Sequence, residues 1–336
     1  MKAALLLALA TPAALAFDSL SIGYGDWTLA CDNTGRCIAA GYQADNAASP
    51  PVSLAFFRDA GADAEPGVAL QALDKHGNPP PELTLLLDDA PLATLKNDSE
   101  LPPAARDALL ERLRRLPLPA IRIRDAQDNH WQLSTQGLRP TLMQMDAHQR
   151  RTNHQSALVN PGAGDAPIPA AEPLPHIRRT IPQGEPRTLA PGSADQQKLA
   201  ALIQRDTPAP CRAPLAQYPI TLHPLGDDRH LGEIESCLLG GGYQPINHYF
   251  ITDSALATLI PDVLDPSIPF NDYASGILTA NERERATADC WQERQYAYDG
   301  QRFVKSADTV HGLCRGFTGG AWEMPLYRSD LHPPAQ

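Results

Sequence analysis

The chain has 336 residues, of which 43% are hydrophobic, and it carries 28 basic against 39 acidic side chains. This length leaves room for about two domains with hydrophobic cores. The formal net charge of −11 argues against binding to nucleic acid or to an anionic membrane surface, because both require a basic protein surface. It would suit a basic partner, although a negative net charge also keeps many proteins soluble.

The first 16 residues show the three regions of a secretory signal peptide: a short positive start, an apolar run over residues 3–10, and a small-x-small motif that ends at Ala16. The apolar run is shorter than the roughly 20 residues that span a bilayer, which argues against a membrane anchor. No later stretch is long and apolar enough to span either. We therefore expect cleavage between Ala16 and Phe17, and export of the mature chain.

All six cysteines follow this segment, and an even number in an exported chain is typical of disulfides. Their spacing groups them into three local pairs, which predicts the disulfides Cys31–Cys37, Cys211–Cys237 and Cys290–Cys314. The alternative is a zinc site, but the sequence has no CxxC motif and no histidine at ligand spacing beside these cysteines. We predict no metal site and no other cofactor.

The pattern over residues 17–160 predicts strands followed by helices. A hairpin is expected around Cys31 and Cys37, which bracket a polar turn, with further strands over 52–57, 68–73 and 83–87. A helix should follow, capped by Asp98 or Ser99, with Pro102-Pro103 in its first turn and an apolar stripe that reaches Leu116.

A second hairpin is expected over residues 121–133, because apolar residues alternate on both sides of a polar turn. The stretch 141–151 then predicts a short helix that offers Leu142, Met143 and Met145 to the core. These features together predict a first domain over residues 17–160.

The segment 161–192 contains eight prolines and four glycines, a composition that disfavours regular secondary structure. We expect it to be an extended linker between two domains. The alternative is an ordered loop that wraps over a domain surface.

The segment 193–336 predicts a second, α+β domain with two of the disulfides. A helix over 194–203 and strands over 220–225, 233–239 and 249–251 are expected, with a tight turn at Gly240-Gly241-Gly242 because no Lys-Ser/Thr follows to make a phosphate loop. A hairpin is expected at Asp299-Gly300, the favoured two-residue turn, which places Tyr296 opposite Phe303.

No known catalytic motif is present in the sequence, and we assign no catalytic residue. The most metal-like cluster is His223 and His230 around Asp227-Asp228, but a polar turn explains it better because no third ligand has a defined spacing. Asp125 and Asp128 lack the glycine and closing glutamate of a calcium loop. Three further carboxylates lie among arginines, which favours a solvated charged segment over a catalytic pair: Glu282, Glu284 and Asp289.

Several groups of residues spread along the chain resemble those of one family. They are Asp26-Trp27, Cys31-Asp32-Asn33, Cys37, Gly41-Tyr42-Gln43, 51–54, Arg58-Asp59-Ala60, Met145-Asp146, Gln149, 157–159, Asp289-Cys290, 298–303 and Cys314-Arg315-Gly316. In these residues the chain resembles the domain-of-unknown-function family numbered 1176, a set of exported proteins of Gram-negative bacteria. The resemblance implies a periplasmic, two-part protein and no established activity. The opening from Trp27 to Cys37 also resembles the invasion-associated locus B family over that segment.

We expect an α+β, mainly β protein made of two small disulfide-stapled domains with short helices. The leading functional hypothesis is a non-enzymatic binding protein, for instance an inhibitor or an immunity-type partner of a basic envelope-active or secreted protein. The alternatives are an envelope-associated hydrolase of unfamiliar type and a structural factor of the cell envelope.

Overall fold

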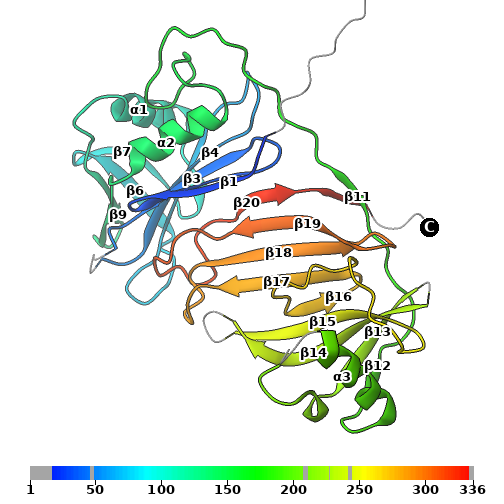
Figure 1. Cartoon of the computed structure of the whole chain (residues 1–336). Helices are drawn as coiled ribbons and strands as arrows, with labels where there is room; N and C mark the ends of the chain where they lie inside the picture. Colours follow the sequence, from blue (N-terminus) through cyan, green and yellow to red (C-terminus); the bar gives the residue numbers. More distant parts are fainter. Residues whose placement is uncertain (1–16, 46–48, 207–210, 227, 241–243, 333–336) are drawn as a thin grey trace, which may run out of the picture.

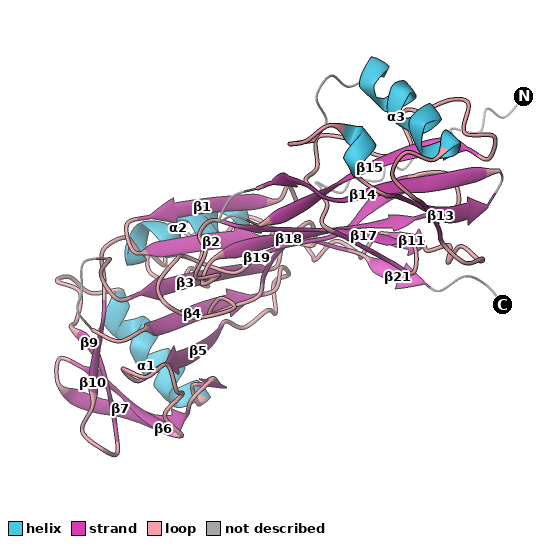
Figure 2. Cartoon of the chain, turned by 90° about the horizontal axis from the view of Figure 1, so that it is seen from below, coloured by secondary structure: helices cyan, strands magenta, loops and turns pink. Residues whose placement is uncertain are grey.

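The computed structural model describes residues 17–45, 49–206, 211–226, 228–240 and 244–332. The predicted signal peptide, including Ala16, lies outside the described residues, which begin at Phe17. No helix in these ranges is long and apolar enough to cross a membrane. The fold is mainly β with short helices, so the fold class expected from the sequence is confirmed (Figures 1 and 2).

The N-terminal half is built on a six-stranded antiparallel sheet with the spatial order β1-β2-β3-β4-β5-β8. A four-stranded sheet of order β10-β9-β6-β7 and helices α1 and α2 share a hydrophobic core with it. The strand bounds are β1 Leu20–Tyr24, β2 Trp27–Cys31, β3 Cys37–Tyr42, β4 Val52–Arg58, β5 Gly67–Ala72, β6 Glu82–Leu87, β7 Ala90–Lys96, β8 Ser99–Glu100, β9 Ile121–Asp125 and β10 His130–Leu133.

Helix α1 spans Pro103–Leu113, and its N-cap is Pro102, whose extended backbone starts the helix without a side-chain cap. The expected caps are wrong, because Asp98 has a positive φ and Ser99 begins β8. The apolar stripe ends at Leu113. Leu116 is 72% exposed, because the helix has already ended before this residue.

Helix α2 spans Leu138–His148, three residues earlier than expected, and starts at Gly137. Leu142 and Met145 are fully buried, as predicted. Met143 is 46% exposed instead of lying in the core, because it falls on the opposite side of the helix from its two neighbours in the core.

The C-terminal half contains a four-stranded sheet, β12-β13-β14-β15, covered by α3 (Ala194–Asp206), and a five-stranded sheet, β16-β17-β18-β19-β20. The strand bounds are β12 Arg187–Leu189, β13 Ile220–Gly226, β14 Arg229–Leu239, β15 Pro245–Asp253, β16 Asp272–Ala274, β17 Ile277–Arg283, β18 Trp291–Tyr298, β19 Phe303–Val310 and β20 Met324–Arg328. The tight turn predicted at Gly240-Gly241-Gly242 falls largely on residues 241–243, which lie outside the described residues.

The predicted pairing of the last hairpin is wrong by two residues. Tyr298, not Tyr296, lies opposite Phe303, and Tyr296 pairs with Lys305. The turn therefore has four residues instead of two. The Asp299 carboxylate accepts hydrogen bonds from the backbone N–H groups of Gln301 and Arg302, and this side-chain bonding stabilises the longer turn.

The last strands of the chain pack against the outer face of the first sheet. Met324 and Leu326 of β20 share a hydrophobic cluster with Ala30 of β2 and Tyr42 of β3. This contact explains why every residue of β2 is buried, although only alternate residues of a strand face the core of the N-terminal half. In Figure 1, β20 (red) lies next to the blue strands of the first sheet.

The Pro-rich segment 161–192 contains two short strands, β11 (His176–Arg178) and β12. β11 pairs in parallel with β21 (Asp330–His332), and β12 adds to the edge of the C-terminal sheet at β13. The expectation that the segment forms no regular element is therefore wrong at these two places. Both strands are tripeptides without proline, so their backbone N–H groups remain available for pairing.

Candidate binding cleft

The structure separates the two histidines of the most metal-like cluster. His223 pairs with Leu231 and His230 with Pro224 on adjacent positions of the β13–β14 hairpin, so the two imidazoles point to opposite faces of the sheet. His223 Nε2 lies 2.8 Å from Oε2 of Glu233. Burial alone would raise the pKa of Glu233, but hydrogen bonds from His223 and Tyr249 hold it below its usual value.

Three carboxylates of the other candidate sites are also bonded to nearby protein groups. Asp125 accepts hydrogen bonds from the backbone N–H groups of Gln127 and Asn129 within its own turn. Glu282 forms an ion pair with Arg294. Asp289 accepts from Arg285, among other groups, so neither Glu282 nor Asp289 stands free as half of an acid–base pair.

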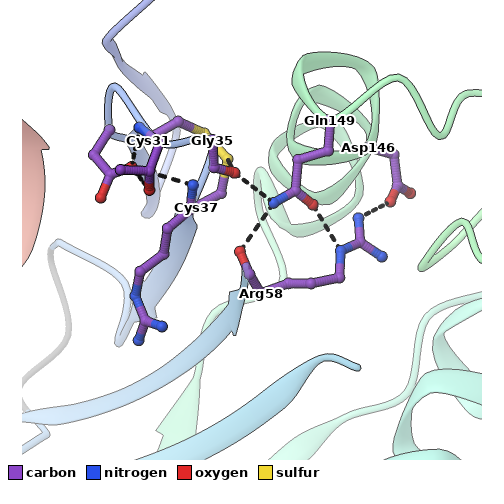
Figure 3. Close-up of a disulfide and its surroundings, with 9 residues drawn as sticks. Cys31, Gly35, Cys37, Arg58, Asp146 and Gln149 are labelled. Atoms are coloured by element: carbon purple, nitrogen blue, oxygen red, sulfur yellow. Dashed lines mark hydrogen bonds and ion pairs between the residues drawn. A yellow bond between two sulfur atoms is a disulfide. The ribbon is translucent and has the colours of Figure 1, made fainter. Parts of the chain in front are cut away.

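The six cysteines form three disulfides, Cys31–Cys37, Cys211–Cys237 and Cys290–Cys314. Beside the first lies a buried polar network (Figure 3). Arg58 donates to the side chains of Asp146 and Gln149, and Gln149 Nε2 donates to the carbonyl oxygens of Gly35 and Arg58. The network joins β4, α2 and the turn inside the disulfide, and its near-complete burial indicates a structural role.

Four residues from the groups that carry the family resemblance join the opening strands to the closing part of the chain: Asp26, Asn33, Gln43 and Arg315. Arg315 donates to Asp26 across 3.0 Å, and its carbonyl oxygen accepts from Gln43 Nε2 at 2.9 Å. Asn33 exchanges two hydrogen bonds with the backbone of Arg328, at 2.8 and 3.0 Å. The residues that carry the family resemblance thus fix the opening strands against the closing ones.

A cleft of about 600 Å³ lies between the two halves. One wall is the edge of the first sheet at β1. The opposite wall is formed by the end of β17 and the start of β18, and residues next to the β14–β15 turn close a third side. This volume falls within the roughly 300–1,000 Å³ that is usual for ligand sites.

Strand β1 presents an unpaired backbone edge to this cleft. Within the described residues β1 pairs with β2 alone, and Tyr24 and Trp27 close a two-residue hairpin. In an antiparallel ladder, hydrogen-bonded pairs alternate with pairs that are not hydrogen-bonded. The closing pair is hydrogen-bonded, so Ser21 and Gly23 fall in the other kind of pair, and their N–H and C=O groups point away from β2. Both residues line the cleft, so their backbone groups are available to a ligand.

Two side-chain oxygens in the cleft wall have no hydrogen-bond partner among the described residues. They are Oε1 of Gln244 and Oδ1 of Asn281, and both atoms are buried. Most buried polar atoms in proteins are hydrogen-bonded, so unpaired acceptors of this kind are suited to N–H donors from a ligand. The exposed carboxylate of Glu284 adds a negative charge at the same wall.

An aromatic surface completes the wall. Trp291 stacks on His311 with ring centroids 3.9 Å apart and an angle of 6° between the rings, and its Nε1 donates to the carbonyl oxygen of Gly319. This contact fixes the orientation of the indole, which lines the cleft. The cleft therefore offers a strand edge, acceptor oxygens, a carboxylate and a rigid aromatic ring.

The family model described as a protein of unknown function, DUF1176, matches residues 23–328. The chain belongs to this family. It is also similar to the uncharacterized protein YpfG of Escherichia coli (strain K12), with 25% identity over 332 residues that cover 89% of this chain and 90% of the relative. No solved structure matches the chain.

The cleft could not be predicted from the sequence, because its walls come from positions more than 200 residues apart. Strand β1 was not predicted either. The alternation of Leu20, Ile22 and Tyr24 with smaller residues is the period-two signal that would have revealed this strand.

Proposed function

We propose that this chain is an exported, periplasmic, non-enzymatic binding protein that takes up an extended, basic segment of a partner protein in the cleft. The partner would be an envelope-active or secreted protein, and the chain would act as its inhibitor or immunity-type partner. The signal-like residues 1–16 and the three disulfides support export, because disulfides persist in oxidising compartments. We further propose that residues 17–160 and 193–336 are two domains joined by the segment 161–192.

The free edge of β1 carries this proposal. An extended peptide can add to such an edge as a further strand, with its backbone bonded to the N–H and C=O groups of Ser21 and Gly23. Its alternate side chains would then face opposite sides of the added strand. Trp291 and Glu284 line the opposite wall of the cleft, where side chains of the added strand would contact them.

The charge of the chain supports a basic ligand. Without residues 1–16, it carries 27 basic and 39 acidic side chains, a net charge of −12. Glu284 places one of these charges in the cleft, beside the cation Arg283 and on the same lining as Gln244 and Asn281. Complementary charge speeds association and selects partners, and this contribution weakens as salt screens it.

A glycosidase-type hydrolase uses a pair of carboxylates, one as the acid and one as the base or nucleophile. Glu282 and Glu284 both lie in the cleft wall, but Arg294 neutralises Glu282. The geometry therefore favours binding over this chemistry. A structural role in the envelope would not depend on the cleft, so variants of the cleft that still support cell-envelope integrity would point to that alternative.

The test is capture of partners from periplasmic extract and culture supernatant by the oxidised protein, at low and high salt. Ser21→Pro removes an outward-pointing N–H without breaking a bond to β2, and Glu284→Lys reverses the charge of that side chain in the cleft wall. We expect a stoichiometric basic partner that both variants lose and that high salt weakens. Glu82→Lys is the matched control, because Glu82 is exposed on β6, outside the cleft. A partner that all three variants retain would refute the proposed site.

A further inference from the structure

The short parallel pair formed by β11 and β21 joins the Pro-rich segment to the last strand of the chain. His176 is in register with Asp330, and Arg178 with His332. The register is fixed from both ends, because Asp330 N–H donates to the carbonyl oxygen of Pro175 at 2.9 Å and Arg179 N–H donates to that of His332 at 3.0 Å. Side chains two residues apart on a strand share a face, so this pairing places two histidines and one aspartate together.

Three potential ligand atoms of these side chains form a nearly equilateral triangle. Oδ2 of Asp330 lies 3.2 Å from Nδ1 of His176 and 3.0 Å from Nε2 of His332. The two imidazole nitrogens lie 3.1 Å apart. Ligands about 2.0–2.1 Å from a common ion lie about 2.9–3.4 Å apart at octahedral to tetrahedral angles, so all three edges fit one bound metal ion.

Hydrogen bonds among these three side chains cannot satisfy all three ligand atoms well. If both ring nitrogens carry a proton and donate to Asp330, two N–H groups face each other across 3.1 Å. If only one carries a proton, the lone pair of the other nitrogen lies against the carboxylate oxygen. A cation at the centre of the triangle attracts all three lone pairs at once.

We propose that His176, Asp330 and His332 bind a divalent transition-metal ion, with zinc as the ion of first choice. Two imidazoles and one carboxylate are a common ligand set for zinc and for other ions of this series. The side chains are 73%, 43% and 54% exposed, so water can reach the ion and fill its remaining positions. Arg178 shares this face, but its exposed side chain can extend into solvent.

Two other clusters of potential ligands do not compete with this site. Cys31 and Cys37 lie near His148, and Cys290 and Cys314 lie near Glu284. All four cysteines are in disulfides, whereas metal binding requires thiolates. Within the part of the chain that the structure describes, the cluster of two histidines and an aspartate is the one whose ligand atoms are all available.

The site would have a structural consequence. Its ligands are separated by 156 residues in sequence and stand on two strands of three residues each. So short a pair gains little stability from its own hydrogen bonds. A metal ion would crosslink residues 176 and 332 and thereby hold the Pro-rich segment against the end of the chain.

The test is calorimetric titration of ZnCl₂ into the full, oxidised protein after removal of any affinity tag, at pH 7.5. We expect saturable uptake of one equivalent, and a rise in Tm with zinc because the ion binds the folded state. His176→Ala and His332→Ala should each weaken zinc binding by at least about tenfold, since loss of even an outer-shell partner costs about 10–100-fold.

His130→Ala is the matched control. His130 is also exposed and lies 3.1 Å from an aspartate, Asp128, but among the residues that the structure describes no second histidine completes its cluster. This variant should bind zinc as the unmodified protein does. All these histidines are on the surface, so each variant should fold, and its Tm without zinc checks this. The proposal is overturned if the protein takes up no zinc in a saturable way, or if His176→Ala and His332→Ala bind it unchanged.

Discussion

Arg58 donates a hydrogen bond across 2.6 Å to Oδ1 of Asp146, and the two side chains are only 1% and 4% exposed. Burial raises the pKa of Asp146, and the neighbouring guanidinium opposes this change. Oδ2 of Asp146 accepts from the N–H group of Leu158, so both carboxylate oxygens are bonded. The pair ties β4 to α2 and to the loop that follows α2.

Arg58→Ala should therefore destabilise the protein strongly. Removal of one partner leaves the other charge buried without compensation, which costs about 3–5 kcal/mol. Arg36→Ala is the matched control, because Arg36 pairs with Asp59 at the surface, where an ion pair contributes about 0–1 kcal/mol. Urea unfolding of both variants measures the two free energies. Equal effects would contradict a structural role for the buried pair.

Met324 should be essential for the contact between the two halves. It is fully buried in the cluster that joins β20 to the outer face of the first sheet. Met324→Ala should lower the free energy of unfolding by about 2–5 kcal/mol through the cavity that it leaves. Met143→Ala, at a site 46% exposed, should change it by no more than about 0.5 kcal/mol. If both variants unfold alike, the cluster does not hold the halves together.

Gly35 lies in the turn inside the first disulfide, with φ at +84°. A Cβ there would approach the ring of Phe17 to 2.6 Å. Gly35→Ala should cost more than the roughly 1–2 kcal/mol of the left-handed backbone alone. Gly77→Ala isolates that backbone cost, because Gly77 has a similar φ of +81° and open space around it. Thermal unfolding gives the difference, and equal costs would show that Phe17 does not pack against this turn.

The free energy of unfolding should depend on pH through the carboxyl group of Asp289. Burial alone would raise its pKa, but hydrogen bonds from Arg285, Thr287 and the N–H group of Gly316 hold the pKa well below its usual value. A carboxyl with a depressed pKa stabilises the fold above its unfolded pKa of about 3.9, and this contribution is lost as the pH falls further.

The measurement is the free energy of unfolding of the unmodified protein and of Asp289→Asn from pH 7 to pH 2. We expect the unmodified protein to be more stable at neutral pH. The difference should shrink below about pH 4, where the unfolded carboxyl takes up its proton. A difference that stays constant over the whole range would contradict the assignment.

The sequence predicts best what depends on near neighbours in the chain. The hairpin at Cys31 and Cys37, the apolar stripe from Ala105 to Leu113 and the mainly β class all follow from short-range patterns, and the structure contains them. The residues at which helices and strands begin and end were harder to predict from the sequence. The helix after Ser99 begins later than expected, because Pro102 serves as its N-cap and the residues before it add a strand to the sheet.

Long-range pairing could not be predicted from local patterns. The cleft brings Ser21 to Glu284, and the proposed metal site brings His176 to His332. In each case the local sequence shows only ordinary strand residues, and the function depends on which strands become neighbours. The register of the hairpin at Tyr298 also escaped prediction, because the bonds of Asp299 favour a four-residue turn.

The most direct test of the binding cleft is photo-crosslinking in the cells that produce the protein. A photo-reactive amino acid replaces Ser21, at the free edge of β1, or Glu82 as the control. We expect Ser21 alone to give an adduct, whose attached peptide is extended and rich in lysine or arginine, and which Glu284→Lys abolishes. Adducts of equal yield from both positions, or none from Ser21, would contradict the proposal that this edge receives a partner.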